Sequence, residues 1–322
     1  MSVDYSALTL ADIRTAHARI REHITRTPVL TSARLDALVG ASLFFKPENL
    51  QKIGAFKARG AANAVFALSA EVAARGIVTH SSGNHGAAVA RAARLRGLTA
   101  QIVMPTNTPR LKVGNVEAEG GHVVWCEPTL AARETTTARL LAETGATLVH
   151  PYNDLHVMAG QGTATLELME DVPNLDLVTC PVGGGGLLSG TAVAAKGVRP
   201  SIRVVGVEPA NADDAARSFK AGQLVGPTTP NTIADGLRGA LGELTFAAIQ
   251  GHVDDIVTVS EEAIIKAMRL VWEHLKIVIE PSAAVPVAAL VEGLISGVAG
   301  QRIGVILTGG NLDLDRLPWQ TA

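Results

Sequence analysis

The stretch LVTCPVGGGGLLSG, residues 177–190, decides the fold class. An apolar pattern typical of a buried strand leads into four consecutive glycines, and a helical pattern then starts at Leu187. A backbone made of Gly183, Gly184, Gly185 and Gly186 can wrap closely around an anion, whose charge the helix N-terminus favours. The run lacks both the Gly-Lys-Ser/Thr ending of a Walker loop and the spacing of the dinucleotide fingerprint. A simple turn rarely needs four glycines, so we favour a phosphate site.

The same order of strand and helix recurs along the chain, which predicts an α/β protein whose parallel sheets carry helices on both faces. The length of 322 residues favours two domains over one. The expected strands are 43–46, 76–80, 101–104, 122–126, 148–150, 177–180, 203–207, 255–259 and 303–307. The expected helices are 11–24, 57–68, 85–96, 130–144, 158–170, 187–196, 261–274 and 282–294.

Composition excludes several classes of function. The net charge is −2 and aromatic residues make up 3%, which argues against binding to nucleic acid or to an anionic membrane surface. No stretch reaches the ~18 apolar residues that span a bilayer, and the N-terminus resembles no signal or transit peptide. The two cysteines, Cys126 and Cys180, lie far apart without metal-ligand spacing. We therefore expect a cytoplasmic protein in a reducing compartment.

Lys57 lies between Phe56 and Arg59 at the expected start of a helix. The positive end of the helix and the charge of Arg59 would both lower the pKa of the lysine, favouring the neutral amine that forms Schiff bases. Taken alone, the segment is better explained as a solvated lysine in a first helical turn.

Two further loops follow expected strands. Residues 81–86, SSGNHG, combine hydroxyl and amide groups with free backbone N–H groups, which suits a carboxylate. Helix capping alone explains them equally well. Thr308, followed by two glycines, could meet the edge of a flat heteroaromatic ring, although a plain glycine turn is the simpler interpretation. A lysine, a phosphate loop, a carboxylate loop and a hydroxyl together indicate one cofactor, pyridoxal phosphate (PLP).

Seven motifs in order along the chain support this interpretation. They are KPENLQKIGAFKARGAANAV, THSSGNHGAAVA, PVGGGGLLSG, GVEPANADDA, TIADGLRGALG, EPSAAVP and LTGGNLDLDRLPW. Together they resemble the serine/threonine dehydratase and serine racemase family, which has the tryptophan-synthase-β fold (PLP fold type II). The context of Lys57 differs from the Thr-Gly-Ser-Val-Lys-Asp pattern of cysteine synthases. The resemblance implies two doubly wound parallel-sheet domains with PLP in the cleft between them. The large domain would comprise 1–74 and 152–322, and the small inserted domain 75–151.

The resemblance also implies the cofactor contacts. Lys57 would bind the PLP aldehyde covalently, Phe56 would pack near the ring, and Asn84 would hydrogen-bond the ring hydroxyl. The four glycines, with the Leu187 amide, would hold the phosphate. Thr308 would face the pyridine nitrogen, where a neutral hydroxyl cannot keep the nitrogen protonated as a carboxylate would. The ring is then a weaker electron sink, which suits prompt β-elimination.

The implied substrate is a small β-hydroxy amino acid. Its carboxylate would bind to Ser81, Ser82, Asn84 and His85. Lys57 would remove the Cα proton as general base, the β-hydroxyl would leave as water, and the product would hydrolyse to a 2-oxo acid and ammonia. Ser82 falls where racemases have a base for the opposite face, so an amino acid (serine or aspartate) racemase with side dehydratase activity is the alternative.

A divalent-cation site is also implied. Glu208, Ala212 and Asp214 match the family's metal segment by residue type and spacing. Two carboxylates and a backbone carbonyl are hard oxygen ligands of the kind that Mg²⁺ or Ca²⁺ prefers. The other interpretation of this segment is a solvated acidic helix start. Related enzymes are usually dimers, and we expect a homodimer by that analogy.

Three positions bear on substrate choice. Tyr152 stands where serine racemases have an Asn near the cofactor, and Gly239 replaces a Ser that faces the far end of the substrate, so the pocket is expected to be larger or of different polarity. Arg133 matches a family arginine at the substrate mouth. It could pair with a second carboxylate, as in 3-hydroxyaspartate, or serve as a structural salt-bridge partner. Two other classes rank lower: a regulatory protein that binds PLP without turnover, and a nicotinamide dehydrogenase.

Overall fold

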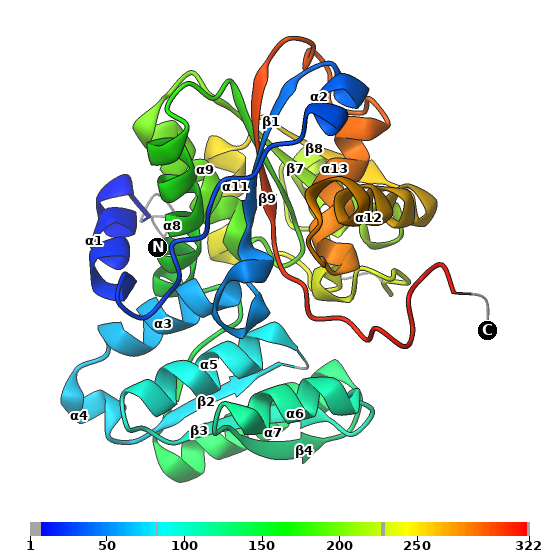
Figure 1. Cartoon of the computed structure of the whole chain (residues 1–322). Helices are drawn as coiled ribbons and strands as arrows, with labels where there is room; N and C mark the ends of the chain where they lie inside the picture. Colours follow the sequence, from blue (N-terminus) through cyan, green and yellow to red (C-terminus); the bar gives the residue numbers. More distant parts are fainter. Residues whose placement is uncertain (1–7, 82, 227–228, 321–322) are drawn as a thin grey trace.

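Two parallel sheets form the framework of the computed structural model, which describes residues 8–81, 83–226 and 229–320 (Figure 1). The larger sheet has the strand order β1-β9-β6-β7-β8, and all neighbours in it are parallel. Its strands are β1 (Ser42–Pro47), β6 (Leu177–Pro181), β7 (Arg203–Pro209), β8 (Asp255–Val259) and β9 (Arg302–Leu307). These strands are nearly continuous apolar runs because helices cover the sheet on both faces.

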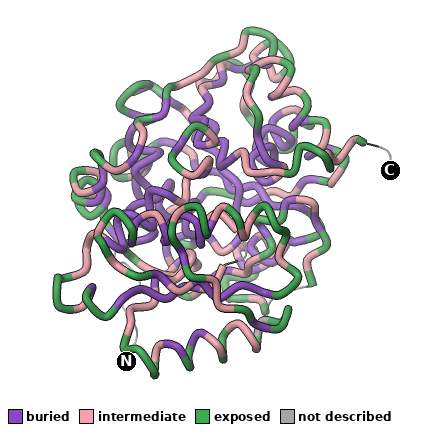
Figure 2. Tube along the Cα trace, turned by 60° about the horizontal axis from the view of Figure 1, so that its bottom comes forward, coloured by how far each residue is buried: buried purple, intermediate pink, exposed green. Residues whose placement is uncertain are grey.

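Helices sandwich the larger sheet, and a separate apolar cluster fills each side. Buried residues concentrate in the interior of the chain trace, and exposed residues lie mostly at its outside (Figure 2). One face carries α2 (Ala33–Val39), α12 (Glu261–Leu275) and α13 (Pro281–Val291). The opposite face carries α8 (Leu155–Asp171), α9 (Gly186–Val198), α10 (Asp214–Ala221) and α11 (Glu243–His252). The first helix, α1 (Leu10–Ile20), packs on α8. Together these elements form the large α/β domain.

The smaller sheet has the order β4-β3-β2-β5 and is also entirely parallel. Its strands are β2 (Ile77–His80), β3 (Ala100–Pro105), β4 (His122–Cys126) and β5 (Thr147–Leu148). One face packs against α3 (Lys57–Ala67), α5 (Asn84–Leu95) and α6 (Arg110–Ala118), and the other against α7 (Leu130–Thr144). The expected fold class, two doubly wound parallel-sheet domains, is therefore confirmed.

Each sheet has one strand pair at which the chain order reverses. In the larger sheet the pair is β6 and β9, and in the smaller sheet it is β2 and β5. Ligands of open α/β sheets bind outside the carboxyl ends of the strands at such switch points. The segments that follow these four strands are therefore the first place to look for a site.

All nine expected strands occur within two residues of their expected bounds, and the eight expected helices within four. The prediction missed the shorter helices α2, α4 (Ala70–Ala73), α6, α10 and α11. Helix α6 shows why, because Val116 is its one buried residue and leaves no apolar stripe to recognise. In the described part of the chain, no helix combines the length and apolarity that crossing a membrane requires.

Candidate active site

Lys57 is the first residue of α3, as its segment predicts. Its Nζ atom donates a hydrogen bond to the carbonyl oxygen of Pro151 at 2.8 Å, across the boundary between the two sheets. The side chain is half-buried, and desolvation of the ammonium lowers the pKa of Lys57 to about 8. A substantial fraction of the amine is therefore neutral near physiological pH, as a nucleophile or base requires.

The expected contribution of Arg59 to this pKa is wrong, because burial alone accounts for the shift. Arg59 is fully buried, and its guanidinium donates to Glu48 at 2.6 and 2.8 Å and to Glu167 at 2.9 and 2.8 Å. Lys46 Nζ also donates to Glu167, at 2.7 Å. We call these four residues the ion cluster. It ties α3 to β1 and α8 and compensates the positive charge of Arg59 locally.

The glycine run after β6 packs so tightly on its protein side that side chains are excluded. A Cβ at Gly184 would overlap the Tyr152 ring, and one at Gly183 would lie 2.9 Å from Leu237 Cα. Gly185 has φ +87°, a left-handed conformation that favours glycine, and α9 begins at the next residue. The amides of Gly183–Leu187 donate to no backbone acceptor among the described residues. A row of free N–H groups at a helix N-terminus suits a phosphate.

Thr308, directly after β9, completes this side of the site. Its side chain is 3% exposed, and its Oγ1 atom has no hydrogen-bond partner among the described residues. Its carbonyl oxygen accepts from Phe56 N at 2.9 Å, so the end of β9 lies against the segment that carries Lys57. A buried hydroxyl without a partner is costly unless a ligand satisfies it. An amine, a bare amide cradle and an orphaned hydroxyl fit PLP by their chemistry.

The loop after β2 has a different construction. Ser81 Oγ accepts from Gly83 N at 3.2 Å, and α5 starts at Asn84 without a side-chain cap. The His85 ring is buried, and its Nε2 atom lies 3.1 Å from the Val149 carbonyl, so Nε2 carries the proton. Burial, followed by the charge of Lys57, holds the pKa of His85 well below its usual value. The His85 ring therefore faces Val149, which leaves its backbone amide for an anion. The predicted Ser82 lies outside the described residues.

Asn84 is bound by two residues that the sequence prediction gave no role. Its Nδ2 atom donates to both carboxylate oxygens of Glu280, at 3.1 and 3.2 Å, and its Oδ1 accepts from Asn311 Nδ2 at 2.9 Å. Glu280 is buried, and desolvation, assisted by the charge of Asp235, raises its pKa to about 7. The position of Glu280 in EPSAAVP, before a helix-starting proline, was the available signal for a capping or ligand-facing acid.

Tyr152 and Gly239, noted separately in the sequence, form one structural feature. A Cβ at Gly239 would lie 3.6 Å from Tyr152 Cε1 and 3.9 Å from Tyr152 Oη. A Cβ at this position would thus be in ordinary van der Waals contact with the tyrosine ring, which borders the space of a side chain at position 239. Gly239 adds no side chain beside Tyr152, so this wall of the site is formed by the aromatic ring.

Arg133 begins the second turn of α7 and is half-buried. Its charge lies close enough to lower the pKa values of His80 and Tyr152, although burial is the largest influence on both groups. The salt bridges of the described residues do not include Arg133. Its guanidinium therefore has the free donors that a second substrate carboxylate would need.

The predicted metal segment brings two carboxylates together. Glu208, at the end of β7, is buried and accepts from the amides of Ala215 and Ala216 at 3.1 and 2.9 Å. Asp214 begins α10, and its Oδ2 atom is buried without a partner. Desolvation and the neighbouring carboxylates raise the pKa of Glu208 to about 9, and burial raises that of Asp214 to about 6. Ala212 lies in the intervening turn, Ala210–Ala212. Among the described residues, no group of three or more His, Cys, Asp or Glu side chains could hold a metal ion. The predicted set would rely on a backbone carbonyl.

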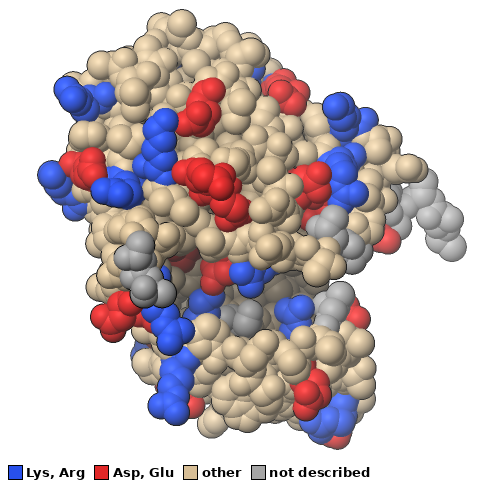
Figure 3. Space-filling view, turned by 90° about the vertical axis from the view of Figure 1, so that its right-hand side faces the viewer, with Lys and Arg blue, Asp and Glu red and all other residues tan. Residues whose placement is uncertain are grey.

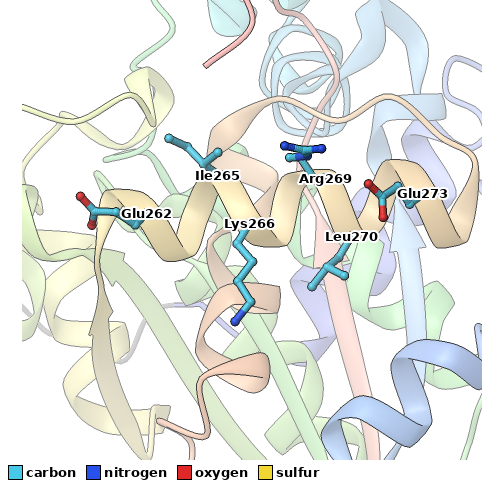
Figure 4. Close-up of a pocket in the computed structure, with 6 residues that line it drawn as sticks. All are labelled: Glu262, Ile265, Lys266, Arg269, Leu270 and Glu273. Atoms are coloured by element: carbon cyan, nitrogen blue, oxygen red, sulfur yellow. The ribbon is translucent and has the colours of Figure 1, made fainter. Parts of the chain in front are cut away.

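A hollow separates the large lobe from the small lobe, and basic side chains gather along it (Figure 3). A different hollow follows the outer face of α12, and it contains none of the predicted site residues (Figure 4). It is lined by Glu262, Ile265, Lys266, Arg269, Leu270 and Glu273. Its alternation of opposite charges along one helix is typical of a solvated face.

Known proteins match this chain over nearly its whole length. The family model described as "Pyridoxal-phosphate dependent enzyme" matches residues 20–309. A beta-hydroxyaspartate dehydratase of Paracoccus denitrificans is 51% identical over 97% of this chain and 98% of its own length. A serine racemase of Arabidopsis thaliana is 50% identical over 97% and 95%. The structure of maize serine racemase superposes with a TM-score of 0.94 at 48% identity, covering 96% of this chain and 95% of that one. The chain therefore belongs to the family of pyridoxal-phosphate dependent enzymes.

Proposed function

We propose that this chain is a PLP-dependent ammonia-lyase that removes water from a β-hydroxy amino acid of the serine, threonine or 3-hydroxyaspartate type, and that 3-hydroxyaspartate is preferred. The observation that carries the proposal is Lys57, a helix-start amine whose pKa is lowered to about 8, in a segment that is hydrogen-bonded to Thr308, whose buried hydroxyl has no partner among the described residues. The similarity to a beta-hydroxyaspartate dehydratase supports the same reaction.

The residues divide the work of holding the cofactor. The amides of Gly183–Leu187 would bind the phosphate, Thr308 Oγ1 would face the ring nitrogen, Asn84 the ring hydroxyl and Phe56 the ring itself. PLP, when bound, supplies the electron sink that makes the substrate's Cα proton acidic. We place the cofactor between a small domain of residues 75–151 and a large domain formed by the rest of the chain.

Lys57 acts as the base. The Pro151 carbonyl oxygen, 2.8 Å from Nζ, orients the amine, and the buried surroundings favour its neutral form. Ser81, Ser82 and the amides of Asn84 and His85 would hold the substrate carboxylate near this base. Loss of the Cα proton to Lys57 and of hydroxide from Cβ gives an enamine, which hydrolyses to the 2-oxo acid and ammonia.

Arg133 favours a substrate with a second carboxylate. A guanidinium that forms no ion pair with a described residue, and whose charge influences the nearby Tyr152, can bind a carboxylate with two parallel hydrogen bonds. Serine and threonine have no group that would use this charge. The similarity to a dehydratase named for β-hydroxyaspartate is consistent with that preference.

The test is a substrate panel with purified holoenzyme, scored by release of 2-oxo acid. Wild type should act faster on a 3-hydroxyaspartate isomer than on serine or threonine. Arg133→Met should lower kcat/KM for that isomer by about 30-fold or more, because the second carboxylate loses its partner, and should affect serine less. Arg139→Met, an exposed arginine of the same helix, is the matched control. Failure of wild type on serine, threonine and every 3-hydroxyaspartate isomer would contradict the proposal.

An amino acid racemase with side dehydratase activity is the second candidate. The 50% identity to a serine racemase and the superposition with the maize enzyme favour it. A racemase needs a base on the face opposite Lys57, and Ser82 is the residue we assign to that role. Chiral analysis of the remaining amino acid separates the two functions: full retention of configuration during turnover supports the lyase.

Glu208, Asp214 and the Ala212 carbonyl are proposed to hold Mg²⁺ or Ca²⁺. Two buried carboxylates with raised pKa values are stabilised by a cation, so either metal should raise the Tm of wild type. Glu208→Gln should abolish the increase, and an equal increase in that variant would contradict the site. By analogy with related enzymes we also propose a homodimer, and from the reduced cysteines a cytoplasmic location.

A further inference from the structure

His150 lies in the segment that connects β5 of the small sheet to α8 of the large domain. Residues 149–154, which we call the crossover, touch each part of the candidate site in turn. The Val149 carbonyl accepts from Thr79 and His85, and the Pro151 carbonyl accepts from Lys57. Tyr152 packs against the glycine run, and Asn153 Oδ1 accepts from Leu244 N at 2.9 Å. Neither the sequence motifs nor the proposed function supplies a role for the titratable side chain of His150.

The tautomer of His150 is fixed by its own backbone. The Nδ1 atom lies 2.9 Å from Asn153 N and 3.3 Å from Tyr152 N. Two amides can donate only to a nitrogen that carries no proton, so Nδ1 is an acceptor and Nε2 bears the hydrogen. Burial, followed by the positive surroundings of His80 and Lys57, lowers the pKa of His150 to about 4. The ring therefore stays neutral, with one N–H on the side away from the crossover turn.

The ring lies close to the proposed base, since the adjacent residue Pro151 accepts the hydrogen bond of Lys57 Nζ. His80 ends β2 and His150 lies two residues after β5, the switch pair of the small sheet, and their rings meet edge to face at 5.6 Å. Tyr152 covers another edge at 4.7 Å. No described residue accepts a hydrogen bond from Nε2. The neighbouring Pro151 binds Lys57 Nζ, the atom that would remove the Cα proton, and the β-oxygen is two bonds from Cα.

We propose that His150 is a further catalytic residue, whose Nε2–H donates a hydrogen bond to the β-oxygen of the substrate as the Cβ–O bond breaks. The assignment rests on the proposed β-elimination. In that step the oxygen leaves with the bonding pair and takes up the proton that Lys57 removed from Cα, so that water is released. His150 contributes a hydrogen bond to the developing negative charge and ends the step unchanged.

Two variants separate this role from a purely structural one. In His150→Asn, the side-chain oxygen can still accept from the Tyr152 and Asn153 amides, but no donor reaches the position of Nε2. In His150→Gln, the longer side chain places its amide group near the position of Nε2. It no longer accepts the hydrogen bonds from the Tyr152 and Asn153 amides. We expect His150→Asn to lose about 100-fold in kcat on β-hydroxy amino acids, the usual effect of removing such a donor, and His150→Gln to lose less. The reverse ranking would show that His150 only closes the turn.

A change of leaving group gives a second readout. Chloride departs without needing a hydrogen bond, so His150→Asn should eliminate chloride from β-chloroalanine within about threefold of wild type. An equal loss on both kinds of substrate would overturn the proposal. Wild-type turnover of β-hydroxy amino acids, measured first, reports on the proposed function alone. Imidazole ¹⁵N NMR of the holoenzyme tests the tautomer without reference to activity: a protonated Nδ1 at neutral pH would contradict it.

Discussion

The two switch points of this molecule have the same strand topology and opposite chemistry. At β6 and β9 of the large sheet, backbone amides and one hydroxyl have no partner among the described residues, and neighbouring backbone and side-chain atoms crowd any Cβ in the glycine run. At β2 and β5 of the small sheet, the end of β2 and the segments after both strands carry the polar side chains of His80, Ser81 and His150, each of them half-buried. Backbone donors suit a phosphate, which is the same in every turnover. Side chains suit a substrate whose shape must be recognised.

Lys57 follows neither pair of switch strands, since it begins α3, and its Nζ atom donates to the crossover. Lys57→Ala should reduce turnover by at least about 10⁴-fold, because both the covalent attachment of PLP and the base are lost. Absorbance of the bound cofactor and release of 2-oxo acid measure the two losses. Lys52→Ala, an exposed lysine of the same segment, should behave as wild type. Retained turnover in Lys57→Ala would contradict the assignment of Lys57 as the residue that binds PLP and acts as the base.

Glu280 lies between the switch points, since it comes before α13 and binds Asn84 of the small domain. Its pKa in the folded protein is raised from 4.5 to about 7, so its contribution to stability is fully present below pH 4.5 and is lost as pH rises through about 7. Relative to Glu280→Gln, wild type should lose about 3 kcal/mol of unfolding free energy over that interval. Denaturant unfolding at several pH values measures the difference.

The exposed Glu273→Gln variant on α12 serves as the control for Glu280. If wild type and Glu280→Gln keep a constant difference from pH 4.5 to pH 8, the carboxylate is not held in the buried contact with Asn84.

The rigidity of the large switch point is tested at Gly184. An alanine there would overlap the Tyr152 ring, so Gly184→Ala should cost about 2 kcal/mol of stability and weaken PLP binding. Gly251→Ala, on the open side of α11, meets no atom within 4 Å and should stabilise the protein by about 0.5–1 kcal/mol. Thermal unfolding and PLP titration measure both. If Gly184→Ala changed neither stability nor PLP binding, the Gly183–Leu187 segment would be able to shift and accommodate the added methyl group.

The smallest effect is expected where the two domains meet at the surface. Lys112 of α6 forms an ion pair with Asp235 of the large domain, and both side chains are partly exposed. Lys112→Met should change stability by less than about 1 kcal/mol, and added salt should reduce the difference further. A double-mutant cycle with Asp235→Asn isolates the pair. A coupling free energy of several kcal/mol would contradict the expectation that this partly exposed ion pair contributes little to stability.

Sequence reasoning recovered the strands and the motif loops because both have local signatures. Buried parallel strands are continuous apolar runs, and runs of glycine or of small polar residues mark the ends of strands. It could not recover what depends on contacts between distant residues. The pairing of Tyr152 with Gly239, the compensation of Arg59 by two carboxylates and the tautomer of His150 are properties of the packed structure.

The ion cluster beneath α3 has a consequence for how this sequence can evolve. Lys46 and Arg59 carry two positive charges, Glu48 and Glu167 two negative ones, and all four side chains are at most 1% exposed. Neutralising any one of them leaves an unpaired charge buried in the protein, which costs about 3–5 kcal/mol of stability. That cost is a large share of the ~5–15 kcal/mol by which a folded domain is stable. Single substitutions at these positions are thus strongly destabilising, whereas simultaneous substitutions that leave no unpaired charge are tolerated better. We expect the four residues to be retained or replaced together among related sequences, even where the substrate-binding loops differ.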